Sequence, residues 1–185
     1  MVRIPEGSAP DFKNKSWAIA AEVTIPERGA SGVLATMGGR FGGWALLMQD
    51  GKPQFVYALS NQSDHKYRVA SDQTVPAGNH VVRFSFKYDE GGIGKGGTGT
   101  LFVDGNQVAQ GAIPRTIAVR VSLDETFDIG EDTGTPVVED YVDKMPFRFT
   151  GTLKRFVVIL EPQKLTDEER KSLREAEAKA RMAVQ

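Results

Sequence analysis

A group of acidic residues in the second half of the chain offers the first candidate for chemistry. Asp124, Glu125, Asp128, Glu131 and Asp132 lie close together in the sequence. A glycoside hydrolase that uses carboxylates needs its acid and its base to face one cleft, which on a strand requires alternate positions. Glu125, Asp128 and Glu131 are spaced by three, so successive members of this series point to opposite faces of a strand. The spacing argues against a hydrolytic site.

The same segment suits a hard cation better. Carboxylates and loop carbonyls are the oxygen ligands that calcium prefers, and Glu131-Asp132-Thr133-Gly134 has the composition of a turn. We predict Asp128, Glu131 and Asp132 as candidate ligands of a calcium site. EF-hand spacing is lacking, so solvated turn carboxylates are the alternative. No other cofactor is indicated.

A second candidate site combines cations with aromatic rings. Arg40 and Phe41 stand between two glycine pairs, and Lys66, Tyr67 and Arg68 are consecutive. Guanidinium and ammonium groups bind sulfate or carboxylate groups, and aromatic rings contribute stacking and cation–π contacts. These residues are therefore predicted to bind a glycan, in particular a sulfated one. For Phe41, the sequence equally allows a place in the core.

Other aromatic and imidazole side chains are interpreted as structural. Trp44 and Tyr57 stand in alternating apolar runs, which is typical of core residues. His65 lies in a polar segment and His80 begins the inward face of a strand, and neither has the companion histidines of a metal site. We interpret both as surface residues or hydrogen-bonded core residues.

A glycine-rich segment, Gly91–Gly99, contains the sequence pattern of a nucleotide-binding loop but lacks the structural context that this pattern needs. Gly92-Ile93-Gly94-Lys95-Gly96-Gly97 fits the dinucleotide pattern, which works only between a strand and a helix whose N-terminus holds the phosphate. Here the next predicted element is a strand. A Walker loop also fails, because Gly96 rather than Ser or Thr follows Lys95. We interpret the segment as a flexible connection between antiparallel strands.

Length and charge narrow the class of protein. The chain has 185 residues, of which 40% are hydrophobic, and this is enough for one sizeable domain. Its 23 basic and 24 acidic residues leave a formal charge of −1, which predicts no nucleic acid partner. No apolar signal core or membrane-spanning run is present, so we expect a soluble chain without a membrane partner. The absence of cysteine fits either a cytoplasmic or a periplasmic location.

The elements that position these residues are predominantly strands. His80–Tyr88 alternates between one apolar and one polar face, Thr98–Val103 follows it, and Gln107–Ile113 returns after the turn Asp104-Gly105-Asn106. Further strands are predicted at Trp17–Ile25, Gly32–Met37, Trp44–Met48, Gln54–Leu59 and Gly151–Leu160, with Asp50-Gly51 as a second hairpin turn. Both faces of the strand at 151–160 are apolar, so we expect both to be partly covered.

The pattern changes after Pro162. Thr166 and Glu169 have the spacing of a capping box, and the run to Met182 is rich in Ala, Glu, Lys and Arg, which predicts a helix. Because its apolar positions are few, we expect a solvated tail or a bridge to a partner. The predicted organisation is an all-β, antiparallel two-sheet sandwich over residues 1–161 and a helical tail over residues 162–185.

Several segments also carry a resemblance to known families. His80-Val81-Val82-Arg83-Phe84, leading into Leu101-Phe102-Val103-Asp104-Gly105, resembles the paired strands of laminin-G-like and concanavalin A-like jelly rolls. Separate blocks are similar, in the same order, to the C-terminal domain of long bacterial arylsulfatases: Arg3–Pro10, Gly38–Gly43, Gly94–Thr100 and Asp124–Gly134. The resemblance covers residues 3 to about 175. It implies a concanavalin A-like jelly roll whose partner is a sulfatase catalytic domain or another subunit.

The resemblance transfers no catalytic residue. Sulfatases need a Cys-x-Pro-x-Arg or Ser-x-Pro-x-Arg motif, and Ser8-Ala9-Pro10-Asp11-Phe12 has Phe where the arginine is required. We therefore predict a non-catalytic accessory domain, structural or interacting, of an arylsulfatase-like enzyme. The alternative is a carbohydrate-binding module for sulfated glycans, and an independent glycoside hydrolase is disfavoured by the carboxylate spacing.

Overall fold

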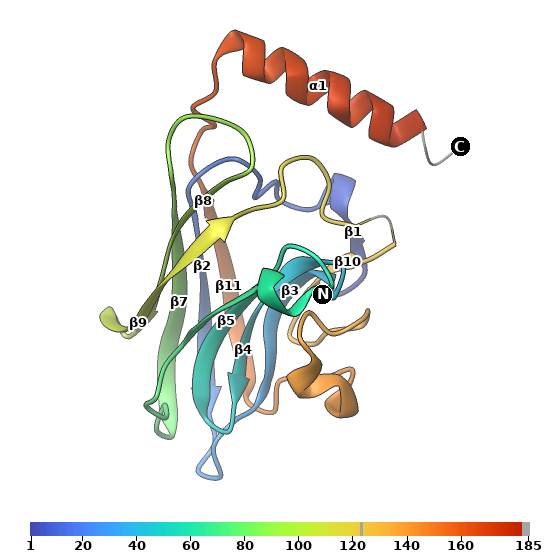
Figure 1. Cartoon of the computed structure of the whole chain (residues 1–185). Coiled ribbons are helices and arrows are strands. Elements are labelled where there is room, and N and C mark those ends of the chain that lie inside the picture. The colour runs from blue at the N-terminus through green and yellow to red at the C-terminus, as the bar shows by residue number, and fades with distance from the viewer. Residues whose placement is uncertain (123, 183–185) are drawn as a thin grey trace.

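The computed structural model of the protein describes residues 1–122 and 124–182 and consists mainly of strands (Figure 1). The strands are β1 (Ile4–Pro5), β2 (Trp17–Ile25), β3 (Gly32–Gly39), β4 (Gly42–Gln49), β5 (Lys52–Ala58), β6 (Lys66–Ala70), β7 (Gly78–Tyr88), β8 (Lys95–Val103), β9 (Asn106–Arg115), β10 (Thr126–Ile129) and β11 (Thr152–Leu160). The helices are the 3-10 helices η1 (Glu6–Ser8), η2 (Ser63–His65) and η3 (Glu139–Lys144), and the α-helix α1 (Asp167–Met182).

The strands form two antiparallel sheets that pack face to face. One sheet has six strands in the order β1-β10-β3-β4-β5-β6, and the other has five in the order β11-β2-β7-β8-β9. Since β2 pairs with β11 on one side and with β7 on the other, the chain crosses between the sheets several times. This arrangement confirms the predicted jelly-roll sandwich with a C-terminal helix. The sequence patterns did not predict the short strands β1, β6 and β10.

The alternation in β7 shows how the sequence divides each strand into two faces. Val82, Phe84 and Phe86 are buried between the sheets, whereas Arg83 and Lys87 on the other face are exposed. The tight turns are also as predicted. Asp104-Gly105 has φ values of 50° and 81°, the left-handed backbone that a two-residue hairpin turn requires.

Aromatic rings hold the two sheets together. Phe55 of the six-stranded sheet stacks on Phe84 of the five-stranded sheet, with ring centroids 3.6 Å apart, and Trp17 and Trp44 pack beside them.

The prediction that Gly91–Gly99 is only a flexible connection is wrong in part, because β8 begins at Lys95. A Cβ atom on Gly99 would lie 2.7 Å from the Phe84 ring, so this glycine makes room for the aromatic core.

A second apolar layer covers the outer face of the six-stranded sheet. Val33, Leu47 and Val56 point outward from this sheet and are buried by the segment of residues 130–149, which includes Tyr141 and Phe147. The central strands β3, β4 and β5 of the six-stranded sheet are therefore buried on both faces. The outer face of the five-stranded sheet remains open around β11, where Ile159 is 56% exposed. The expectation that both faces of this strand are covered is wrong there.

Helix α1 lies across the end of the sandwich (Figure 1). The capping box is confirmed, because Thr166 N donates to Glu169 Oε2 at 2.7 Å and Glu169 N donates to Thr166 Oγ1 at 3.2 Å. Leu165 and Leu173 are buried, so the segment is more than a solvated tail. No helix in the described residues is long and apolar enough to span a membrane.

Candidate functional site

The structure brings three of the predicted cationic residues to one place. Lys66 and Arg68 are two residues apart on β6 and share its outer face, and Arg40 reaches the same place from the turn between β3 and β4. Opposite them are Glu139 and Asp140 at the start of η3. Between β6 and η3 lies a groove of about 310 Å³, lined by Asn61, Ser63, Lys66, Tyr67, Arg68, Val138, Glu139 and Asp140. We call it the β6 groove.

Lys66 and Arg68, which line the β6 groove, and Arg40, which lies beside it, are held in two different ways. Arg68 is locked by hydrogen bonds, since its guanidinium group donates to Gln54 Oε1 and to Asp140 Oδ2. Arg40 Nη1 and Lys66 Nζ lie 3.6 Å and 3.9 Å from the same atom, Glu139 Oε1. These are contacts between charges and are longer than hydrogen bonds. Arg40 and Lys66 therefore keep unused N–H donors in the described part of the chain.

The two predicted aromatic residues have different positions. Phe41 is 70% exposed in the β3–β4 turn beside Arg40, so the alternative that it packs in the core is wrong. The ring of Tyr67 packs against the central core, because Tyr67 lies between Lys66 and Arg68 and points to the opposite face of β6. The structure therefore does not bring the Tyr67 ring to the cations. Trp44 and Tyr57 are buried, as predicted.

The carboxylates predicted as calcium ligands are engaged in the fold. Asp128 Oδ2 accepts hydrogen bonds from Thr133 N and Thr133 Oγ1 at 2.8 Å and 2.6 Å, and Asp128 Oδ1 accepts one from Arg3 N. Glu131 pairs with Arg148 at 2.9 Å. Within residues 1–122 and 124–182, no group of three His, Asp or Glu side chains is placed to hold a metal ion. The calcium prediction gains no support, because protein donors occupy the oxygen atoms.

Asp132, the third predicted ligand, is buried and holds η3 in place through a hydrogen bond to Tyr141. Its Oδ2 accepts a hydrogen bond from Tyr141 Oη at 2.8 Å, and its Oδ1 accepts one from Gly134 N at 3.1 Å. Burial raises the pKa of Asp132 to about 6, the charges of Asp128 and Glu125 add to the rise, and the hydrogen bonds oppose it. Tyr141 Oη also accepts from Val137 N at 2.8 Å. These contacts fix the position of η3 and its carboxylates.

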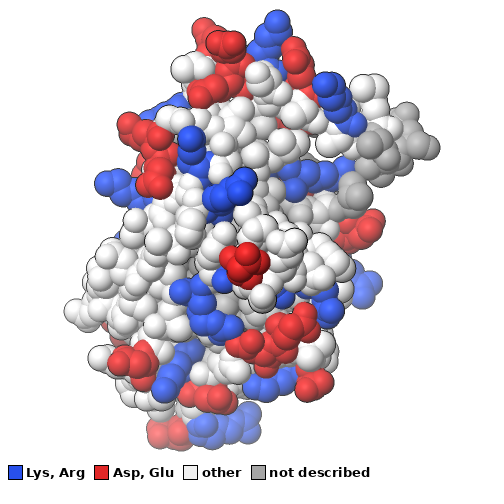
Figure 2. All heavy atoms as spheres, viewed as in Figure 1, with Lys and Arg blue, Asp and Glu red and all other residues white. Residues whose placement is uncertain are grey.

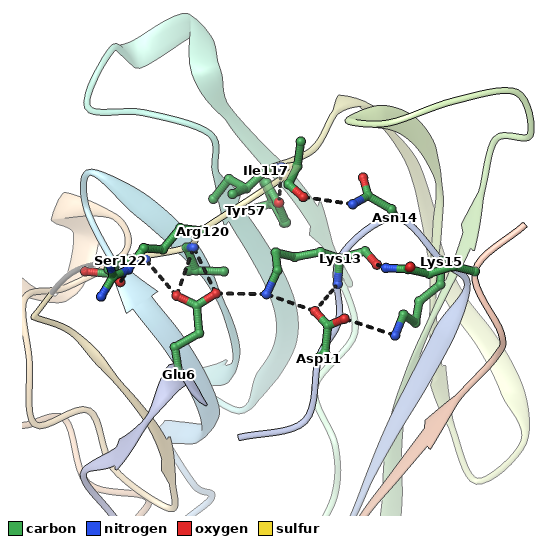
Figure 3. A network of polar contacts seen from close by, with 12 residues as sticks. Glu6, Asp11, Lys13, Asn14, Lys15, Tyr57, Ile117, Arg120 and Ser122 are labelled. Carbon is green, nitrogen blue, oxygen red and sulfur yellow. Dashed lines mark hydrogen bonds and ion pairs between the residues drawn. The ribbon is translucent and has the colours of Figure 1, made fainter. Parts of the chain in front are cut away.

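A separate polar network joins the N-terminal segment to the loop of residues 117–122 (Figure 3). The Glu6 carboxylate accepts hydrogen bonds from Val121 N at 3.1 Å and Lys13 Nζ at 2.9 Å, and Lys13 also pairs with Asp11 at 2.9 Å. Burial lowers the pKa of Lys13, but the hydrogen bonds to Asp11 and Glu6 outweigh it and leave this pKa raised. All of these groups are paired with one another, so the network serves to close one end of the sandwich.

The structure also shows a groove that the sequence did not predict. It has a volume of about 570 Å³ and lies on the outer face of the five-stranded sheet, above Ala18 of β2. Arg83 and Lys87 of β7 line one wall, and Ile159 of β11 lines the other. Asp89 and Glu161 also line this groove, so it has no strong excess of one charge. The signal in the sequence was the pair of small outward residues Ala18 of β2 and Ser85 of β7, which lie opposite each other and line this groove.

Comparisons with known proteins identify the fold. No family model matches the chain, and no curated protein matches it. Among solved structures, the chain is similar to the CBM40 domain of the Ruminococcus gnavus IT-sialidase, with a TM-score of 0.54 and 16% identity over 87% of this chain and 84% of that one. Domains LG4-5 of the mouse laminin α1 chain also give a TM-score of 0.54, with 13% identity over 89% of this chain and 40% of that one.

A third similar structure is the receptor-binding domain of botulinum neurotoxin mosaic serotype C/D. It gives a TM-score of 0.51 and 12% identity over 88% of this chain and 36% of that one. At these identities the comparisons concern the fold alone. They confirm the prediction of a concanavalin A-like, laminin-G-like sandwich.

Proposed function

We propose that this domain is a non-catalytic glycan-binding module that holds an oligosaccharide in the β6 groove. The observation that carries the proposal is the convergence of Arg40, Lys66 and Arg68 on Glu139 and Asp140. Residues from three separate parts of the chain meet there and present donors and acceptors side by side. Sugar hydroxyl groups both donate and accept hydrogen bonds, so such a surface suits them.

The shape and borders of the groove agree with this function. Its volume of about 310 Å³ lies at the lower end of the range for small-molecule sites, which is suitable for a few sugar units. Phe41, exposed beside Arg40, offers an aromatic surface for the apolar face of a sugar ring. Positive and negative side chains are interspersed on the face seen in Figure 2, which fits a ligand recognised by local contacts rather than by a broad field.

Similar structures support the same function. The CBM40 domain of the Ruminococcus gnavus IT-sialidase has been solved bound to α2,3-sialyllactose, and that structure gives a TM-score of 0.51 at 14% identity. A sandwich of this shape therefore can present a glycan-binding surface. The proposal includes no hydrolytic step, because Glu125 and Asp128 accept hydrogen bonds from Thr135 and Thr133 within the fold.

The first test is a titration of the protein with 3′-sialyllactose and with lactose, followed by NMR of the backbone amides. We expect shifts to concentrate at residues 61–68 and 138–141. Lys66→Gln should weaken binding of 3′-sialyllactose about tenfold, because it removes a charged hydrogen-bond donor. Lys52→Gln, an exposed residue at the start of β5, is the matched control. Shifts absent at millimolar sugar, or confined to another surface, would overturn the proposal.

Association with a sulfatase is a further proposal that rests on the resemblance of the sequence blocks alone. None of the three similar structures described above is a sulfatase. In this proposal the module is appended to a sulfatase catalytic domain and brings it to a sulfated glycan. Sequencing the coding region around the gene segment for this chain tests the idea. A contiguous reading frame without a formylglycine motif would contradict it.

A further inference from the structure

We infer that Glu139 sets the charge of the ligand, so that the β6 groove selects an oligosaccharide carrying one negative charge. The inference rests on the proposed glycan-binding function and names the ligand class for the same groove. In the described part of the chain, three cations meet only two carboxylates here. Arg68 pairs with Asp140, and Arg40 and Lys66 both face Glu139.

Arg68 and Asp140 form a pair of their own. The Arg68 guanidinium group donates one hydrogen bond to Asp140 Oδ2 and another to Gln54 Oε1. A guanidinium group held at two points keeps its orientation, and its charge is balanced by the adjacent carboxylate. This pair therefore shapes the groove without adding net charge to it.

Arg40 and Lys66 share the remaining carboxylate. Glu139 Oε1 lies 3.6 Å from Arg40 Nη1 and 3.9 Å from Lys66 Nζ. Two positive charges facing one negative charge leave one positive charge in excess. Because both distances exceed hydrogen-bond length, both cations retain N–H donors. A single carboxylate or sulfate group on a sugar can accept from both and neutralise this excess.

The backbone that carries Glu139 is anchored in the fold. Tyr141, two residues further along η3, is buried, and its hydroxyl group bonds to Asp132 Oδ2 and to Val137 N, each at 2.8 Å. The Tyr141 ring also stacks on Phe147, with centroids 5.3 Å apart. Displacing this part of η3 would break buried contacts. The backbone of Glu139 is therefore held at the edge of the groove, where its carboxylate supplies negative charge.

This arrangement distinguishes ligands by their number of charges. A neutral sugar gains only hydrogen bonds, whereas a sugar with one anionic group also gains the attraction of the excess positive charge. A second anionic group on the same sugar faces Glu139 and Asp140, and juxtaposed like charges disfavour binding. The contacts in this groove thus favour one carboxylate or sulfate group over a heavily sulfated glycan.

The test uses lactose, 3′-sialyllactose and a disaccharide carrying two sulfate groups, titrated by calorimetry at low salt. We expect 3′-sialyllactose to bind about tenfold more tightly than either of the other sugars, the size of one charge-assisted contact. Glu139→Gln should raise affinity for the disulfated sugar about tenfold and leave lactose within about twofold. Asp143→Asn is the matched control, because Asp143 is exposed on the same 3-10 helix.

The outcomes separate this inference from the proposed function. If lactose and 3′-sialyllactose bind equally well and Glu139→Gln changes neither the ranking nor the affinities, the inference is overturned and glycan binding stands. If none of the sugars binds at millimolar concentration, both are overturned. If Glu139→Gln and Asp143→Asn have equal effects, Glu139 is not the selecting residue. Thermal melting of each variant verifies that it is folded.

Discussion

Asp132 is a carboxylic acid placed inside the protein, where charge is disfavoured. It lies beneath η3, is almost completely buried and is close to two further carboxylates, Asp128 and Glu125. Its pKa of about 6 in the folded protein lies above the ordinary value of 3.8. The folded state therefore binds a proton at Asp132 more tightly than the unfolded state does. Protonation of this group stabilises the fold, and its ionisation destabilises it.

The pH dependence that follows has a definite sign. The stabilising contribution of Asp132 is fully present below pH 3.8 and is lost as the pH rises through about 6. Asp132→Asn is uncharged throughout, so it removes this dependence. Between pH 4.5 and 7.5 the free energy of unfolding of the variant, relative to wild type, should rise by about 2 kcal/mol. Urea titrations at the two pH values measure the difference.

The control for this experiment is Asp143→Asn, which removes an exposed carboxylate from η3. Asp11 and Asp104, whose pKa values are lowered, are present in every variant, so their opposite pH dependence cancels in the comparison. A relative stability of Asp132→Asn that stays constant from pH 4.5 to 7.5 would contradict the assigned cause.

At the same scale, the sequence predicted some of the candidate site and not the rest. Arg40, Lys66 and Arg68 were identifiable from residue type and from neighbouring aromatic residues. Their partners Glu139 and Asp140 were not, because they are about seventy positions from β6 and meet it only through the fold. The orientation of Tyr67 follows from the alternation of β6, but this strand is short and polar and was not predicted.

At the scale of single elements, α1 shows how few apolar residues can attach a helix. The helix is strongly charged, yet Leu173 is buried against the sandwich and Leu165 is buried just before the helix begins. Lys164 also pairs with Glu90 at 2.6 Å, although an exposed pair of this kind stabilises little. The sequence predicted the helix and its capping box correctly, because both are local patterns. It did not predict the docking, which depends on distant residues.

Leu173→Ala should therefore release the helix from the sandwich. Removing a buried leucine side chain costs about 2 kcal/mol or more, which corresponds to about 30-fold faster exchange of the amides in residues 167–182 if the helix opens locally. Hydrogen exchange followed by mass spectrometry measures this rate. Ser172→Ala, exposed on the same turn, is the control. Equal exchange in the two variants would mean that Leu173 does not attach α1.

At the scale of the whole molecule, the two sheets have unequal surroundings. The six-stranded sheet is covered on its outer face by the segment that carries η3, whereas the five-stranded sheet presents an open outer face. The alternation of the long strands predicted the shared core between the sheets. It could not predict the second layer, because Val137 and Phe147 lie in irregular backbone and Tyr141 lies in the short 3-10 helix η3, so these residues form no repeating pattern.

The contrast between the inner and outer faces of β7 tests this architecture. Phe84 stacks on Phe55 across the two sheets, so Phe84→Ala leaves a cavity at the centre of the sandwich. We expect this variant to lose about 3 to 5 kcal/mol of unfolding free energy.

Arg83, the adjacent residue, lies on the open face, with its guanidinium carbon 5.4 Å from the centroid of the Phe102 ring. Arg83→Ala should therefore cost less than about 1 kcal/mol, since it removes an exposed cation–π contact. Denaturant titrations of both variants supply the comparison. Equal losses would show that the face of β7 that joins the sheets had been assigned incorrectly, because only the inner face can couple the two sheets through the aromatic core.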